Sequence, residues 1–492
     1  MGIMKKIITV LTLFSTISLF GFTPLDNDEC LNCHDALGDE PSQLFKNDIH
    51  YLNGISCKGC HGGDNKTDDM DAAMNKKAGF IGVPKGNEIS ERCSTCHSDP
   101  EFMKKYNKNL PVNQMALLKN SVHGGLALNG KERIVQCTTC HGAHGIVSVK
   151  NHSSPVYPLN IPRTCAKCHS NAVLMREYNP SLPVDQLDKY RTSVHGIRNG
   201  KGDPRTAECV SCHGSHDILP VKDANSNVYP INLPKTCAKC HSNADYMREY
   251  KIPVQQYEKF SMSVHGIALL QNKDLSAPSC NSCHGNHGAV PPGVESISKV
   301  CGTCHVLNAD LFSSSPHKKA FDEHNYPECE TCHSNHLIIS ATDKLLGVTK
   351  EAVCSRCHSE NENVKGYRVA KEMRLLMDSL DHSEELAKNL VNEAEQKGME
   401  ISEAKFKLRD AHQAKLQART MVHSFNEGKF KEIVDGKGLA TTNEIIAEAN
   451  NAIDEFYFRR IGLGISVLVI SFLALMIFLY IRRMERSKKS EK

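Results

Sequence analysis

All 22 cysteines of this 492-residue chain occur in one pattern, Cys-x-x-Cys-His, which is repeated eleven times. Two thiols at this spacing can add to the two vinyl groups of a haem, and the histidine that follows at once can bind the haem iron. The pattern is the attachment motif of c-type haem, so the sequence predicts eleven covalently attached haem c groups. The motifs are Cys30/Cys33/His34, Cys57/Cys60/His61, Cys93/Cys96/His97, Cys137/Cys140/His141, Cys165/Cys168/His169, Cys209/Cys212/His213, Cys237/Cys240/His241, Cys280/Cys283/His284, Cys301/Cys304/His305, Cys329/Cys332/His333 and Cys354/Cys357/His358.

Other uses of paired cysteines fit this pattern less well. A Cys-x-x-Cys pair can be half of a zinc site or a redox-active dithiol, and the cysteines of exported proteins often form disulfides. None of these uses requires a histidine directly after the second cysteine in eleven copies. A formal net charge of +3 and the lack of a long basic block also argue against nucleic-acid binding.

Each iron that is bound by a motif histidine needs a second axial ligand or keeps an open face. Fourteen histidines lie outside the motifs, and nine of them occupy repeated positions. Five lie at the end of a short helical segment. Four follow a motif histidine by three residues, where they cannot reach the far face of their own haem and should bind a neighbouring one. We expect all nine to be distal ligands, which favours low reduction potentials. They are His50, His123, His195, His265 and His317 in the first group and His144, His216, His287 and His336 in the second.

Two of the eleven irons then have no assigned partner. Asp64 occupies the place where the other modules have the second histidine of His-x-x-His, so one haem near the N-terminus lacks its expected ligand. Five further histidines are candidates, and the one at position 152 fits a surface loop. These candidates are His152, His324, His382, His412 and His423.

The elements that must position these residues are repeated along the chain. Residues 164–172 recur without change as residues 236–244. A Pro-Val start is followed three times by a short helical run that ends in Ser-Val-His-Gly, where glycine suits a helix end. The repeat predicts five modules of two haems each, preceded by the single motif at Cys30.

The motifs span residues 30–358, which leaves about 30 residues for each haem. This number of residues is too small to form an ordinary apolar core around each site. The haems themselves must therefore serve as the core. We expect a mostly irregular fold with short α-helices wrapped around a haem core and little or no β-structure. An α-helical bundle should follow, because helical periodicity runs through residues 367–397 and again through 402–422. Residues 435–438 predict a turn before a third helix.

Two apolar segments predict where the chain lies. Residues 1–22 have the form of a signal peptide, with an uncleaved anchor as the alternative. Residues 461–481 carry no charge and are long enough to span a bilayer. The tail at 482–492 has six Lys or Arg residues, which favours the cytoplasmic side. The sequence thus predicts an undecahaem domain at 23–360 that faces the periplasm, a helical stalk or bundle at 361–460, and one C-terminal transmembrane helix in the cytoplasmic membrane.

Over residues 30–358 the chain resembles multihaem c-type cytochromes. Its Ser-Val-His-Gly segments and Cys-x-x-Cys-His-Gly-x-His motifs resemble those of cytochrome c3-like and other electron-transfer cytochromes with two histidine ligands per iron. Residues 411–425 resemble the C-terminal helices of the nitrite reductase and hydroxylamine oxidoreductase lineage, where a long helix ends near a haem-ligating histidine. That resemblance implies His423 as the tenth distal ligand. The Cys-x-x-Cys-Lys haem motif usual in pentahaem nitrite reductases has no counterpart in this sequence.

These features favour a membrane-anchored periplasmic cytochrome that relays electrons between a membrane quinol-oxidising partner, such as a quinol dehydrogenase, and a periplasmic cytochrome or reductase. The alternative is a multihaem oxidoreductase with one open haem iron, of the nitrite reductase or hydroxylamine oxidoreductase type. The C-terminal helices could also join copies of the chain into a homo-oligomer.

Overall fold

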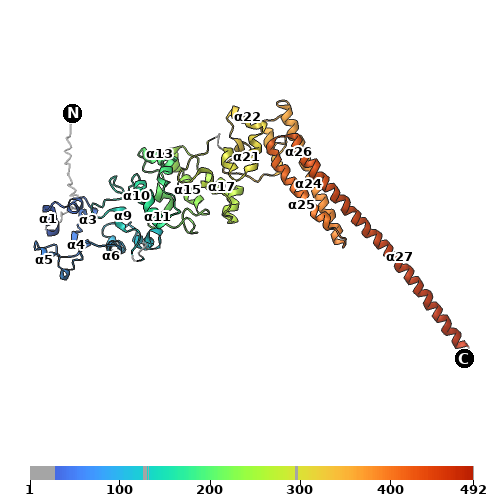
Figure 1. The fold of residues 1–492 in the computed structure, drawn as a ribbon, viewed down its shortest axis with the longest axis horizontal. Helices are drawn as coiled ribbons and strands as arrows, with labels where there is room; N and C mark the ends of the chain where they lie inside the picture. Colours follow the sequence, from blue (N-terminus) through green and yellow to red (C-terminus); the bar gives the residue numbers. More distant parts are fainter. Residues whose placement is uncertain (1–27, 126–129, 131, 294–296, 491–492) are drawn as a thin grey trace, which may run out of the picture. The chain divides into compact units, whose positions relative to one another are not determined.

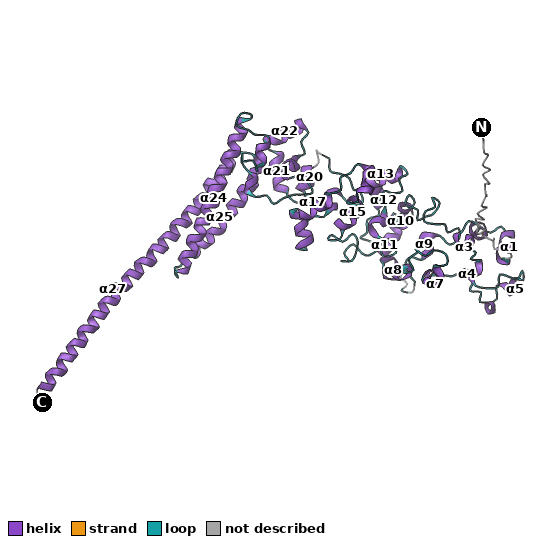
Figure 2. Cartoon of the chain, turned by 180° about the vertical axis from the view of Figure 1, so that it is seen from behind, coloured by secondary structure: helices purple, strands orange, loops and turns teal. Residues whose placement is uncertain are grey.

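The computed structural model describes residues 28–125, 130, 132–293 and 297–490. The predicted signal segment, residues 1–22, lies outside them. The described residues form helices and loops without a β-strand (Figure 2), which confirms the predicted fold class. The chain divides into two compact units, Met1–Val254 with Pro278–Val290 and Gln255–Ala277 with Pro291–Lys492.

The first unit consists of short helices joined by loops (Figure 1). Its α-helices are α1 (Glu29–Ala36), α2 (Glu40–Phe45), α3 (Ile49–Leu52), α4 (Cys57–His61), α5 (Met70–Ala73), α6 (Asn87–His97), α7 (Pro100–Met103), α8 (Gln114–Asn120), α9 (Cys137–His141), α10 (Ile161–His169), α11 (Ala172–Tyr178), α12 (Gln186–Thr192), α13 (Val194–Gly200), α14 (Cys209–His213), α15 (Leu233–His241), α16 (Ala244–Met247) and α19 (Cys280–His284). Three 3-10 turns accompany them, η1 (Lys76–Ala78), η2 (Val122–Gly124) and η3 (Arg248–Tyr250).

The motif helices are short because the sequence stops them directly after the motif histidine. In α4, α9, α14 and α19 the next residue is a glycine with φ between 67° and 85°, a backbone conformation that ends a helix. In α10 and α15 a proline in the first turn fixes the start of the helix. Each of these attachment motifs therefore lies in a separate short helix with a defined start or end.

The Ser-Val-His-Gly segments differ from the predicted helix ends. The preceding helix stops before the serine, and the serine begins a new turn that carries the histidine. In the three copies the serine Oγ accepts a hydrogen bond from the glycine N–H at 2.9–3.1 Å. The glycine is needed for close approach rather than for a helix end, because a Cβ on Gly196 would lie 1.9 Å from the carbonyl oxygen of Tyr190.

The second unit combines short helices with a helical bundle. Its elements are α17 (Gln256–Met262), α18 (Val264–Gly266), the π-helical η4 (Ile267–Gln271), α20 (Ile297–Gly302), α21 (Val306–Ser313), α22 (Pro316–His324), α23 (Glu328–His333), η6 (Asp343–Leu345), η7 (Val353–Arg356), α24 (Val364–Gln396), α25 (Ser402–Met421), η8 (Val422–Ser424), α26 (Glu427–Ile433), the π-helical η9 (Val434–Leu439) and α27 (Ala440–Ser490).

Helices α24, α25 and α27 pack around two apolar clusters, as the predicted helical periodicity requires. Ser383, the polar break in the apolar face of α24, donates a hydrogen bond to Thr442 Oγ1 at 2.6 Å. The predicted turn at 435–438 is wrong, because η9 continues from α26 into α27. Gly438 instead allows close packing, since a Cβ there would lie 2.7 Å from Leu380 Cδ1.

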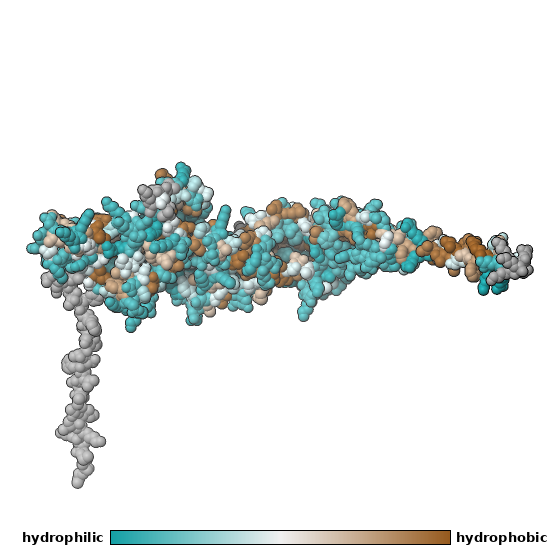
Figure 3. Space-filling view, turned by 90° about the horizontal axis from the view of Figure 1, so that it is seen from below, coloured by the Kyte–Doolittle hydropathy of each residue, from teal (hydrophilic) through white to brown (hydrophobic). Residues whose placement is uncertain are grey.

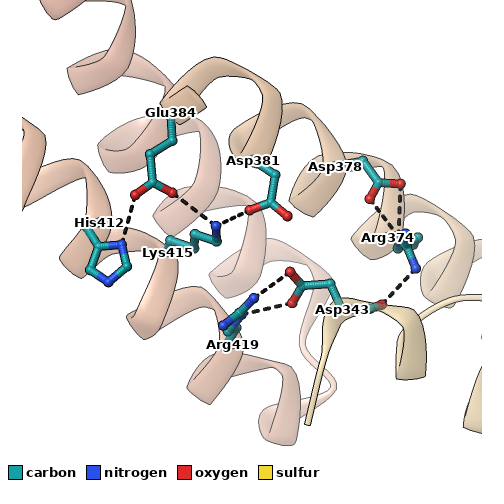
Figure 4. A network of polar contacts seen from close by, with 8 residues as sticks. All are labelled: Asp343, Arg374, Asp378, Asp381, Glu384, His412, Lys415 and Arg419. Atoms are coloured by element: carbon teal, nitrogen blue, oxygen red, sulfur yellow. Dashed lines mark hydrogen bonds and ion pairs between the residues drawn. The ribbon is translucent and has the colours of Figure 1, made fainter. Parts of the chain in front are cut away.

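Charged side chains fasten the loop between the last two motifs to the bundle (Figure 4). Arg419 on α25 donates to both carboxylate oxygens of Asp343 at 2.9 and 2.7 Å, and Arg374 on α24 donates to the Asp343 carbonyl oxygen at 2.8 Å. Nearby, the Glu384 carboxylate accepts hydrogen bonds from His412 at 2.8 Å and from Lys415 at 3.1 Å. The bundle therefore positions the segment that leads into the last attachment motif.

Helix α27 extends past the bundle as one helix of 51 residues. The side chains of residues 461–481 are exposed, and Figure 3 shows an apolar band on this helix. The most apolar 18-residue window of the helix has a mean hydropathy of 2.7, and none of its residues is buried. By length and composition α27 can cross a membrane, in agreement with the predicted span.

Candidate metal centres

Histidines of the attachment motifs come together with histidines from outside the motifs. In nine pairs the ring centroids lie 5.8–6.3 Å apart. The pairs are His50–His97 (6.0 Å), His61–His144 (6.2 Å), His123–His169 (6.1 Å), His141–His216 (6.2 Å), His195–His241 (6.2 Å), His213–His287 (6.1 Å), His265–His305 (6.3 Å), His317–His358 (5.8 Å) and His333–His423 (6.0 Å).

The spacing of these pairs fits one iron between two imidazoles. A bond from a metal to a histidine nitrogen is about 2.0 Å long, and with roughly 1.1 Å from that nitrogen to the ring centre the two centroids stand about 6.2 Å apart. Burial lowers the pKa of His123 and His195, and lowers that of His317 to about 4. These imidazoles are therefore neutral near pH 7, the form that binds a metal.

Two rules relate the pairs to the sequence. The second histidine of His-x-x-His pairs with the motif two positions earlier, as His144 does with His61. The histidine that opens a module pairs with the second motif that follows it, as His50 does with His97. Both rules hold for every member of the two groups in the nine pairs.

Backbone hydrogen bonds tie together the two kinds of ligand-bearing turn. The N–H before an opening histidine is donated to the carbonyl two residues after a His-x-x-His histidine. These bonds are Ile49 to Ile146 (2.7 Å), Val122 to Ile218 (2.8 Å), Val194 to Ala289 (3.1 Å) and Val264 to Ile338 (2.9 Å). The last bond gives His336 the same backbone register as His144, His216 and His287.

The bundle contributes to the two pairs of the last two motifs. His423 lies in η8, after α25, and its Nδ1 donates to the Thr420 carbonyl oxygen at 3.0 Å, which fixes the ring opposite His333. Phe425 packs on His317 with ring centroids 3.7 Å apart. Gly366 leaves room for His358, since a Cβ there would lie 2.2 Å from its Nδ1. Phe425 belongs to the segment that carries the resemblance at residues 411–425, which gave it no role, and the sequence patterns gave no indication of Gly366.

The remaining histidine candidates have other contacts in the described part of the chain. His152 packs on Tyr157 with ring centroids 4.4 Å apart, and His412 is bonded to Glu384. His324 Nδ1 donates to the carbonyl oxygen of its own helix four residues earlier, and His382 is exposed on α24. None of these four is brought to a motif histidine.

Cysteines of successive motifs lie close together. The first cysteines of four neighbouring motif pairs are near enough that each thiol shifts the pKa of the other, Cys93 with Cys137, Cys165 with Cys209, Cys237 with Cys280 and Cys301 with Cys329. The second cysteines approach the next motif closely enough to interact electrostatically in four places, Cys60 with Cys96, Cys140 with Cys165, Cys212 with Cys237 and Cys332 with Cys354. Within each unit, neighbours in sequence are thus neighbours in space.

The second cysteines of the motifs differ in exposure. Those that are exposed are Cys33, Cys60, Cys283, Cys304 and Cys357, and the others are half-buried. Two of the half-buried thiols interact electrostatically with the second cysteine of the preceding motif, Cys96 with Cys60 and Cys168 with Cys140. Cys304 accepts a hydrogen bond from the adjacent Thr303 hydroxyl at 3.9 Å. Haem attachment at all 22 sulfurs stays a prediction from the motif, in which the second cysteine follows the first by three residues.

Comparison with known proteins agrees with this arrangement. Family models match two parts of the chain, cytochrome c3 over residues 49–170 and cytochrome c554 and c-prime over residues 21–62. The chain is 23% identical over 313 residues to the C-type polyheme cytochrome OmcC of Geobacter sulfurreducens. That match covers 54% of this chain but only 38% of the relative, and no solved structure matches significantly. The motifs and these matches together support a multihaem c-type cytochrome.

Proposed function

We propose that this cytochrome carries eleven haems, one on each attachment motif, and relays electrons along them in sequence order within each unit. The proximity of the cysteines of successive motifs carries the proposal. Each cysteine sulfur would bond to the edge of its haem, so sulfurs that lie close together would bring two haem edges close together. Electrons tunnel rapidly over such short gaps, so electrons can pass along the chain of haems without a diffusing carrier.

The histidines outside the motifs would supply the second ligand of ten irons. Nine are the partners in the observed pairs, and His336 is the tenth because it repeats the sequence position and backbone register of His144, His216 and His287. Two histidine ligands give an iron a lower potential than a histidine and a methionine. The protein supplies ligands and positions, and the haems supply the redox chemistry.

We place the haem-bearing residues 23–360 in the periplasm, with residues 361–460 as a stalk and residues 461–481 of α27 as the anchor in the cytoplasmic membrane. The apolar N-terminal segment and the six basic residues after the span support this orientation. An anchored chain of haems suits electron transfer between a membrane quinol dehydrogenase and a periplasmic cytochrome or reductase. The bundle would also be the surface through which copies of the chain associate.

Native membranes supplied with a quinol test the anchored relay. The full-length protein and a variant that lacks residues 461–492 would be compared at equal haem content, with haem reduction followed by absorbance. We expect the full-length protein to be reduced at least tenfold faster, because only it stays beside a quinol-oxidising enzyme. Equal rates for the two proteins would contradict the role of the anchor.

A further inference from the structure

Neither pairing rule supplies a partner for His34 of the first motif. A His-x-x-His histidine for it would have to follow His97 by three residues, where the sequence has Pro100. An opening histidine would have to lie before Cys30, and residues 1–29 contain no histidine. By the same rules a histidine at position 64 would serve a motif earlier than Cys30, so Asp64 does not account for the missing ligand.

No other histidine compensates within the residues that the structure describes. The nine pairs use nine of the non-motif histidines, and among the described residues no histidine ring is paired with His34. His152, in the same unit as His34, is packed on Tyr157 instead.

The contacts around the first motif nevertheless orient His34 for binding to an iron. Asp28 caps α1 by accepting the Leu31 N–H at 3.3 Å. The Asp39 carboxylate accepts a hydrogen bond from His34 Nδ1 and another from the Ser42 N–H at 3.1 Å, so it is fixed at the start of α2. A carboxylate on Nδ1 orients the imidazole, leaves Nε2 for the metal and makes it a more basic ligand.

We propose that the haem on Cys30 and Cys33 has His34 as its one histidine ligand and that its distal face binds a small molecule with a lone pair for iron, such as CO, NO or nitrite. This assignment rests on the proposed haem content. The first haem would then be high-spin, whereas each of the other ten irons would have two histidine ligands. The assignment also places the ligand-binding iron at the N-terminal end of the series of haems, which can supply it with electrons.

Carbon monoxide titration of the reduced full-length protein tests the assignment, with haems counted independently by pyridine haemochrome and mass. We expect eleven haems and one CO per chain. The variant Cys30→Ser/Cys33→Ser should keep ten haems and bind no CO, whereas Cys137→Ser/Cys140→Ser should keep ten haems and still bind at least one. A wild-type protein with eleven haems that takes up no CO would overturn the assignment, as would CO uptake that persists in the first variant.

A count below eleven would instead contradict the proposed haem content. Peptide mass mapping would then show whether Cys30 and Cys33 carry a haem, and the inference fails if they do not.

A second measurement needs no loss of haem. Only a five-coordinate ferrous haem shows an iron–histidine stretching band in resonance Raman spectra. We expect one such band, shifted to lower frequency in Asp39→Asn, because the imidazole loses its carboxylate partner. Asp35→Asn is the matched control, since Asp35 is adjacent to His34 but bonds to Gln43 and Lys46. Absence of the band, or a band that does not move in Asp39→Asn, would refute ligation by His34.

Discussion

Replacing Gly196 with alanine should detach His195 from its iron although neither histidine is changed. The new Cβ would lie 1.9 Å from the Tyr190 carbonyl oxygen, whereas carbon and oxygen atoms in close contact stay about 3.3 Å apart. The turn must therefore move by about 1.4 Å. This turn carries His195, whose ring lies 6.2 Å from that of His241. An iron–nitrogen bond of about 2.0 Å cannot absorb such a shift.

Gly200→Ala is the matched control, because Gly200 lies on the same helix and a Cβ there would meet nothing within 4 Å. Low-temperature electron paramagnetic resonance of the oxidised protein counts high-spin haems, and CO titration counts accessible irons. Gly196→Ala should add one high-spin haem and one CO per chain, and strain of about 1–3 kcal/mol should lower the midpoint of thermal unfolding. If it matches Gly200→Ala in both counts, the close approach at Gly196 does not position His195.

Three further predictions concern the second unit. His423→Ala should add one CO-binding haem, at the motif of His333. His412→Ala should add none, because that histidine bonds to Glu384. Equal CO uptake by the two variants would argue against His423 as a ligand. Burial raises the pKa of Asp343, but the hydrogen bonds and charge of Arg419, together with Asp381 and Lys415, outweigh it and keep this pKa below its usual value. The carboxylate therefore stabilises the fold above about pH 4, and that stability is lost as the pH falls through the lowered pKa. Asp343→Asn should unfold at a lower temperature at pH 7 and lose less on acidification than the wild type, and parallel pH profiles would contradict this. Removal of residues 461–492 should release the protein from membranes with its haem spectrum unchanged, and a membrane-bound truncation would show that another segment anchors it.

Repetition made most of the candidate ligands predictable from the sequence. Nine histidines recur at fixed places in the modules, and the structure brings eight of them into pairs with motif histidines. The partner of each was not predictable, because it depends on contacts between modules. The hydrogen bond from Val122 to Ile218, for example, joins turns 96 residues apart. No local pattern encodes such a register.

His423 was predicted for a different reason, since it belongs to no repeat and only the resemblance of residues 411–425 indicated it. The structure places it opposite His333 through the bundle, so the helices after the last motif complete a site in the motif region. The sequence alone gave no measure of that dependence, because α25 and the motif of His333 lie far apart along the chain.

The role of two glycines was predicted wrongly from the sequence. The glycine of Ser-Val-His-Gly predicted a helix end, and residues 435–438 predicted a turn. At Gly196 and Gly438 the requirement is close packing against Tyr190 and Leu380. Such a requirement depends on what lies opposite the glycine in the fold, and local sequence does not contain that information. At the Cys-x-x-Cys-His-Gly motifs, by contrast, the glycines have positive φ angles and do end the helix.

The most direct test of the account is a haem count on the purified full-length protein that also reports spin state. Intact mass combined with quantitative low-temperature electron paramagnetic resonance gives both numbers from one preparation. The account predicts eleven covalently bound haems per chain, ten of them low-spin with two histidine ligands and one high-spin. Fewer haems, with cysteines recovered as free thiols, or several high-spin irons would contradict the assignment of one haem to each motif and one histidine partner to each of ten irons.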